Sequence, residues 1–189
     1  MALRRLFSTV RPSGTSSEVA HEFLTRSQRR GPLVQKQLLD GNQLQRLAQT
    51  LGRRELLRGH GVADETPENG TPLPPGYHLA YFTPSCYEEQ LGRDGSDRTF
   101  NPSPPFTRRM WAGGEIVWSG DNVLRVGDVV TETTTVLKAE PKKTRDGGDM
   151  IVVGVEKIFR NENGVALVDK RQILPLDFFH IPSTGDYQY

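Results

Sequence analysis

Residues suited to binding a ligand are concentrated between positions 102 and 130. This stretch contains the adjacent pair Arg108 and Arg109, both tryptophans of the protein, and the pair Gly113 and Gly114. A guanidinium group presents a rigid fork of donors that suits an anion, and an indole ring offers a large apolar surface with one N–H donor. Glycines let another chain segment or a flat ligand approach the backbone closely. The alternative is a tight corner that enters a sheet, with both tryptophans in the core.

Strand geometry separates the roles of the two arginines. Neighbouring side chains on a strand point to opposite faces, so at most one of Arg108 and Arg109 can face a given ligand. Trp111 lies two positions after Arg109 and shares its side if the segment is extended. We therefore expect Arg109 and Trp111 to form the contact pair and Arg108 to be solvated.

Composition narrows the classes of function. The 189 residues suit one domain with extra segments, and the net charge of +1 argues against a nucleic-acid surface built on bulk charge. The single cysteine, Cys86, excludes an internal disulfide and is expected to be a buried or idle thiol. No run approaches 18 apolar residues, so no membrane span is predicted. We find no metal-ligand spacing and no nucleotide-binding glycine loop, so we expect no metal and no cofactor.

The first 17 residues differ in character from the rest of the chain. They contain Arg4, Arg5 and Arg11, six serines and threonines, and no acidic residue. A basic, hydroxyl-rich and acid-poor N-terminus is typical of a transit peptide, and the alternative is a disordered basic tail. We expect residues 1–17 to be a transit-like segment and the protein to lie in the mitochondrial matrix.

The next elements are predicted from periodicity. Leucine and alanine recur at helical spacing within residues 40–57, behind the N-cap candidates at 40–42, which predicts a surface helix. Residues 59–75 are rich in glycine and proline and form the expected internal boundary. We then predict a short strand over 77–82 and a helical turn over 85–91.

Three long segments rich in Val, Ile and Thr predict strands over 129–138, 150–160 and 165–174. Asn163-Gly164 is typical of a hairpin turn that needs positive φ, so the strands should form an antiparallel meander. Lys157 interrupts the apolar series of the middle strand and is expected to mark an edge of the core. Because three strands and one helix are marginal, we expect another domain or another copy to complete the sheet.

Several strings together resemble a known family. They run from Leu73 to Pro84, from Phe100 to Gly114 (including Arg-Arg-Met-Trp-Ala-Gly-Gly) and from Leu124 to Asp128, followed by the meander. Over residues 33–176 the chain is similar to the N-terminal half of MaoC-like double hot dog proteins. Within that family it most resembles fungal mitochondrial 3-hydroxyacyl-thioester dehydratases and mesaconyl-type acyl-CoA hydratases.

The resemblance implies an α+β hot dog fold, in which an antiparallel sheet wraps around a helix, as one half of a double hot dog. The implied organisation is a transit-like segment (1–17), an N-terminal helical segment and linker (18–72), a hot dog domain (73–176) and a C-terminal tail (177–189). The implied partners are an acyl thioester of coenzyme A or acyl-carrier protein, and a second hot dog half or a second copy. The implied substrate-binding residues are Arg108, Arg109, Trp111, Gly113 and Gly114.

The chain lacks the family's hydratase signature, Gly-Asp-x-Asn-Pro-apolar-His, in which aspartate and histidine serve as acid and base. None of the four histidines has an aspartate five positions before it; they are His21, His60, His78 and His180. We therefore assign no catalytic residue. The expected function is the acyl-binding half of a (3R)-hydroxyacyl-thioester dehydratase or enoyl-thioester hydratase of mitochondrial fatty acid metabolism. The alternatives are a non-enzymatic acyl-thioester-binding or interaction module and a single hot dog thioesterase.

Overall fold

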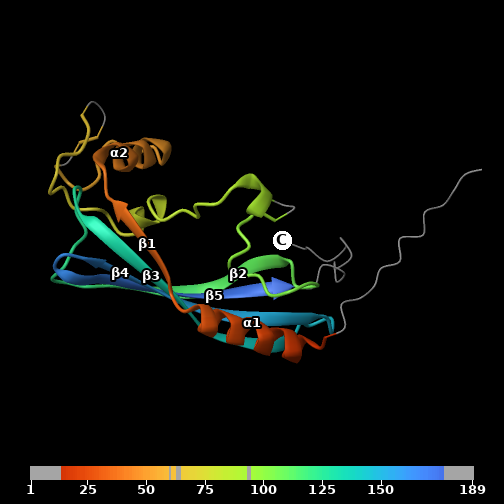
Figure 1. Cartoon of the computed structure of the whole chain (residues 1–189). Coiled ribbons are helices and arrows are strands. Elements are labelled where there is room, and N and C mark those ends of the chain that lie inside the picture. Colours follow the sequence, from red (N-terminus) through yellow and green to blue (C-terminus); the bar gives the residue numbers. More distant parts are fainter. Residues whose placement is uncertain (1–13, 60, 63–64, 93–94, 177–189) are drawn as a thin grey trace, which may run out of the picture.

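The computed structural model describes residues 14–59, 61–62, 65–92 and 95–176 (Figure 1). The predicted C-terminal tail and most of the transit-like segment lie outside these residues. The helices and helical turns are α1 (Ser16–Arg30), α2 (Gly41–Thr50), η1 (Tyr77–Ala80) and η2 (Glu88–Gln90). The strands are β1 (Leu33–Leu38), β2 (Arg108–Trp118), β3 (Val129–Lys143), β4 (Asp149–Asn161) and β5 (Gly164–Leu176).

All five strands form one antiparallel sheet in the order β1-β3-β4-β5-β2. Consecutive strands β3, β4 and β5 are neighbours, which confirms the predicted meander, and each begins and ends within a few residues of its expected bounds. At the turn between β4 and β5, Gly164 has a φ of +108°, whereas Asn163 keeps a negative φ. The glycine alone therefore supplies the left-handed backbone conformation of this hairpin.

The two edges of the sheet have different neighbours. Strand β1 pairs with the first part of β3, and α1 runs beside the second part, where Ser16 donates a hydrogen bond of 3.1 Å to Asp149. Helix α1 begins with a capping box between Thr15 and Glu18 and ends at Gly31, which has a φ of +79°. At the opposite end, β2 pairs only with β5 among the described residues.

Two apolar clusters form the core. In the first, α2 and the segment around η1 pack on β4 and β5, with Leu44, Phe82 and Phe159 among its buried residues. In the second, Val19, Ala20 and Phe23 of α1 pack with Phe106 and with the buried valines of β4. The predicted helix over 40–57 is confirmed as the shorter α2, which Asp40 caps by accepting a hydrogen bond of 2.9 Å from the Gln43 N–H.

Two predictions about local structure are wrong. The stretch around Arg108 is not a corner with a tryptophan core: it is an 11-residue edge strand on which Trp111 is 71% exposed and Trp118 45% exposed. Residues 77–82 do not form a strand, because Gly76 turns the chain with a φ of +87° and the helical turn η1 follows. The predicted turn near residue 88 is confirmed as η2.

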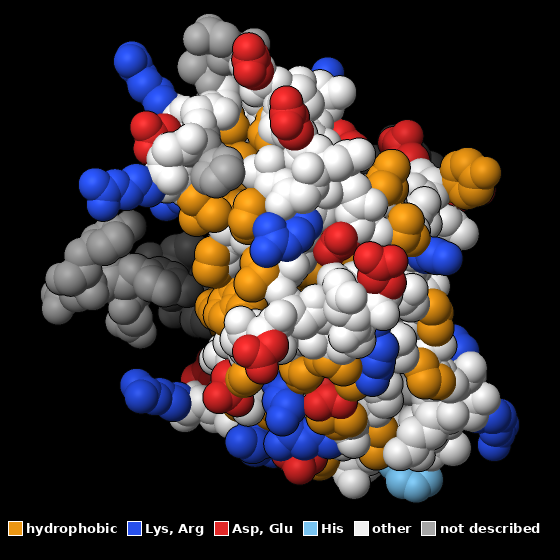
Figure 2. Space-filling model, turned by 90° about the vertical axis from the view of Figure 1, so that its left-hand side faces the viewer, with side chains coloured by type: hydrophobic (Ala, Val, Ile, Leu, Met, Phe, Trp, Pro, Cys, Tyr) orange, Lys and Arg blue, Asp and Glu red, His pale blue; other side chains and the backbone are white. Residues whose placement is uncertain are grey.

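The surface carries charges of both signs. On the face that Figure 2 shows, lysine and arginine side chains are interspersed with aspartate and glutamate, in keeping with the net charge of +1. Hydrophobic side chains lie between them. None of the described helices is long and apolar enough to cross a membrane.

The two adjacent glycines of β2 differ in their surroundings, because only Gly114 lies against the backbone of a neighbouring strand. Gly113 lies at a β-bulge with a φ of +148°, and a Cβ on Gly114 would lie 2.6 Å from the Lys170 carbonyl oxygen of β5. We predict that Gly114→Ala lowers the free energy of unfolding by about 1–3 kcal/mol, because the two strands must separate slightly. Gly120→Ala, where nothing lies within 4 Å, serves as the control and should change it by less than about 0.5 kcal/mol. Equal urea-unfolding midpoints for the two variants would contradict this.

Candidate functional site

A band of polar residues crosses the buried face of the sheet between the two apolar clusters. Side chains two positions apart on a strand share a face, so the pattern can be followed along each strand. On β3, Glu132 and Thr134 lie between Val130 and Val136, and the same order repeats on the next two strands. The polar band is defined by Glu132, Thr134, Lys157, Asp169 and Arg171. Lys157 therefore lies between two parts of the core, and the prediction that it marks an edge is wrong.

The charges of the polar band are paired inside the protein. Lys157 Nζ lies 2.8 Å from Glu132 Oε1, which also accepts a hydrogen bond of 2.7 Å from the Thr134 hydroxyl. Arg171 donates from both Nε and Nη2 to Asp169 Oδ2, at 2.8 and 2.6 Å. The carboxylate side chains are 7% and 3% exposed, so each depends on its cationic partner. The four charges sum to zero.

His78 lies against this band from the turn η1. Its ring meets Phe159 edge to face at 5.0 Å, and the residue is only 2% exposed. The pKa of His78 is lowered to about 4, chiefly by burial; Asp169 and Glu132 act to raise the pKa, and Arg171 and Lys157 act to lower it. His78 is therefore neutral near pH 7. Its Nε2 is buried and has no hydrogen-bond partner among the described residues.

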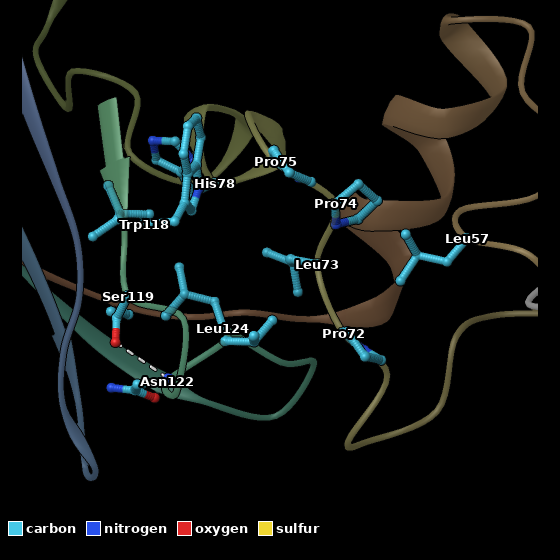
Figure 3. A pocket seen from close by; sticks show the side chains of 13 residues that line it. Leu57, Pro72, Leu73, Pro74, Pro75, His78, Trp118, Ser119, Asn122 and Leu124 are labelled. Carbon is cyan, nitrogen blue, oxygen red and sulfur yellow. Dashed lines mark hydrogen bonds between the residues drawn. The ribbon is translucent and has the colours of Figure 1, made fainter. Parts of the chain in front are cut away.

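A pocket of about 360 Å³ opens beside His78 (Figure 3). Its walls are mainly apolar. They come from the Pro-rich segment before η1, the end of β2, the loop after β2 and the start of β5, and include Leu73, Trp118, Leu124 and Leu167. His78 and Trp118 lie at one end of the pocket, and Leu57 lies at the other. Such a lining suits a chain of methylene groups, with few polar groups to fix its orientation.

The predicted substrate-binding residues lie elsewhere on β2, and none of them lines this pocket. Arg109 pairs with Pro175 and Trp111 with Ile173, so the two share a side of the strand, and Arg108 is exposed. Arg109 Nη1 lies 3.5 Å from the Asp97 carboxylate. Arg109 and Trp118 are separated by about 30 Å along the strand, at 3.3 Å per residue. A ligand that touches both must be long and extended.

The cysteine and possible metal ligands were also examined in the described part of the chain. Cys86 is expected to be either a buried or an idle thiol; its side chain is exposed, so it is not buried, and an idle thiol stays a prediction. No group of three or more His, Cys, Asp and Glu side chains that could hold a metal ion occurs among the described residues. The polar band and His78 were missed, since they converge only through strand pairing.

The buried ion pair of the polar band yields a prediction. Lys157→Met leaves the Glu132 carboxylate buried without its cation and should lower the free energy of unfolding by about 3–5 kcal/mol. The double variant Glu132→Met with Lys157→Met should recover most of this loss. Lys143→Met is the control, because its ion pair with Asp149 is largely exposed and is expected to contribute less than about 1 kcal/mol. Equal losses in the two single variants, measured by urea unfolding, would contradict it.

Comparisons with known proteins give the family. Residues 76–178, more than half of the chain, match the model of the hydroxyacyl-thioester dehydratase type 2 family. Over 98 residues the chain is 32% identical to the mesaconyl-C(4)-CoA hydratase of Chloroflexus aurantiacus; the match covers 51% of this chain and 34% of that protein. The match therefore spans about a third of the length of this curated relative.

One solved structure agrees with this chain in overall fold. The crystal structure of the ChsH1-ChsH2 complex from Mycobacterium tuberculosis contains a chain that matches with a TM-score of 0.60 and 12% identity, over 83% of this chain and 90% of that one. The MaoC-like dehydratase from Rhodospirillum rubrum matches with a TM-score of 0.41 and 19% identity, over 78% and 92%. The predicted α+β hot dog fold is confirmed. With its sheet, its covering helices and its matching sequence, the chain belongs to the hydroxyacyl-thioester dehydratase type 2 family.

Proposed function

We propose that this chain is the acyl-binding half of a (3R)-hydroxyacyl-thioester dehydratase or enoyl-thioester hydratase. The observation that carries the proposal is the apolar pocket beside Trp118 and Leu73, in a chain of the dehydratase family. His78 is the one titratable side chain among the described residues that line it. A neutral imidazole whose pKa is about 4 is a poor general base near pH 7. The hydration step is therefore assigned to a partner.

The proposed partner is a second hot dog half or a second copy that pairs with the edge of β2. No second strand pairs with the 11-residue β2 in the part of the chain that the structure describes, and the exposed apolar side chains of β2 include Met110, Trp111 and Val117. A long apolar edge strand is a template for strand addition. Light scattering at micromolar concentration tests this proposal. A well-folded monomer, both for the chain alone and for the chain mixed with the partner half, would contradict it.

The proposed location is the mitochondrial matrix, and the proposed role is in fatty acid metabolism. The support is the basic, acid-poor composition of residues 1–17. Import of a fluorescent reporter fused to these residues tests the location, and a reporter that stays in the cytosol would count against it.

A non-enzymatic acyl-thioester-binding module is the second candidate function. The missing acid–base pair favours it, and it predicts no activity with any partner half.

The first functional prediction separates binding from chemistry. The full chain should bind octanoyl-CoA but should not hydrate trans-2-octenoyl-CoA above background, because a general acid or base typically contributes 10² to 10⁴ in rate. Val123→Trp should weaken binding by about tenfold, because Val123 lines the pocket and is partly exposed. Val34→Trp, on the exposed side of β1, is the matched control. Calorimetry that shows equal affinity for both variants would reject the pocket as the acyl site.

The second functional prediction concerns the two arginines. We expect Arg109→Gln to weaken coenzyme A thioester binding severalfold at low salt and by less at high salt, because a guanidinium attracts phosphate electrostatically. Arg108→Gln, at the neighbouring exposed position, is the matched control and should bind as the wild type does. Equal affinities for the two variants, without salt dependence, would reduce Arg109, Trp111 and the glycine pair to structural roles.

A further inference from the structure

Part of the pocket wall is a loop. Residues 119–128 join β2 to β3, and the loop residues that line the pocket are Ser119, Asn122, Val123 and Leu124 (Figure 3). Leu73, on the Pro-rich wall, donates its backbone N–H to the Leu124 carbonyl oxygen at 2.8 Å. The two walls are therefore joined, and the position of the loop determines the position of both.

Asn161 holds this loop from outside the pocket. It is the last residue of β4 and is not among the residues that line the pocket. The side-chain amides of Asn161 and Asn122 donate to each other, at 3.0 and 2.9 Å. Asn161 Nδ2 also donates to Asp128 Oδ2 at 2.9 Å, and its Oδ1 accepts from the Asn163 N–H at 3.0 Å. These four bonds use both donors and both lone pairs of the amide.

The hairpin is the fixed side of this contact. Asn161 lies opposite Gly164 in the ladder between β4 and β5, and Asn122 donates a further bond of 3.2 Å to the Gly164 carbonyl oxygen. The loop has no such ladder at Asn122, so its position there depends on side-chain bonds. Because Asn161 bonds to Asn122 within the loop and to Asp128 at its end, a single amide holds the loop at two points.

We propose that Asn161 is a positioning residue that sets the width of the pocket, and with it the preference for straight acyl chains over wider groups of the same carbon number. This inference rests on the proposed function and deepens it by naming what determines selectivity at that site. A close wall makes dispersion contacts with a narrow methylene chain, and a small gap removes much of that attraction. A loosened wall therefore penalises the narrow chain and admits the wider group.

The test is calorimetric binding to the full chain of two thioesters with eight acyl carbons, octanoyl-CoA and cyclohexylacetyl-CoA. The wild type should bind octanoyl-CoA more tightly. Asn161→Asp keeps the shape of the side chain but loses its donors, and its charge faces the Asp128 carboxylate. This variant should bind octanoyl-CoA about threefold to tenfold more weakly, the range that corresponds to one hydrogen bond, and the ratio of the two affinities should fall towards one.

Further variants separate positioning from stability. Asn161→Ala removes the bonds without adding a charge and should also lower the ratio. Asn161→Asp combined with Asp128→Asn exchanges donor and acceptor between the two positions and should recover part of it. Phe23→Leu is the control, because Phe23 is buried in the second cluster on α1. It should lower the urea-unfolding midpoint and leave the affinity ratio unchanged.

The outcomes distinguish the inference from the proposed function. If octanoyl-CoA binds but the wild type shows no preference for it, the inference is wrong while the proposed function stands. The same holds if both Asn161 variants keep the wild-type ratio, or if Phe23→Leu lowers it equally. If neither thioester binds to the wild type, the proposed function fails and the inference fails with it.

Discussion

The buried ion pair between Lys157 and Glu132 constrains much of this structure. Neither charge tolerates burial without the other, so β3 and β4 must align to bring Thr134 opposite Lys157, with Glu132 one diagonal step away. On the other side, Lys157 lies opposite Asp169 of β5, whose own partner is Arg171. A shift of one residue would turn these side chains to the other face of the sheet. The polar band thus specifies the register of the three central strands.

The band also divides the core. On one side of it α1 covers the second cluster, and on the other α2 and the segment around η1 cover the first. A single long helix across this face would have to bury the charged groups against its own apolar side. Because α1 and α2 each cover only one cluster, the helical turn η1 can place His78 against the polar band. The ring of His78 is neutral, so it adds no charge there. The pocket lies on the α2 side of this division, next to the same histidine.

The sequence predicts the parts of the fold that depend on local pattern. The central strands are evident from their valines and isoleucines, and α2 from its Asp40 cap and the spacing of Leu44 and Ala48. Strand β1 is not evident, because Gln35-Lys36-Gln37 becomes a strand only by pairing with β3. The tryptophans of β2 misled the prediction, since large aromatic residues usually indicate a core and here lie exposed on an edge.

The candidate site was less predictable than the fold. The helical turn that carries His78 contains consecutive buried residues, Tyr77 and His78, which no alternating strand pattern would produce. The band opposite it joins residues from three strands, and nothing in the neighbourhood of Lys157 indicates that Glu132, 25 positions earlier, is its partner. Resemblance to a family supplied the expectation of an acyl ligand, but the pocket itself exists only through tertiary contacts.

The unequal ends of the sheet limit how this protein can associate. At one end the six-residue β1, with the charged Lys36 on its exposed side, and the helix α1 share the flank of β3. At the other end β2 presents its full length. Within the described part of the chain, the sheet therefore has one long edge strand that is open to pairing, and one short edge strand that carries a charged side chain and lies beside a helix. If two molecules pair through their β2 strands as proposed, each long edge is covered by the other, so the expected assembly is a closed pair and not a fibre.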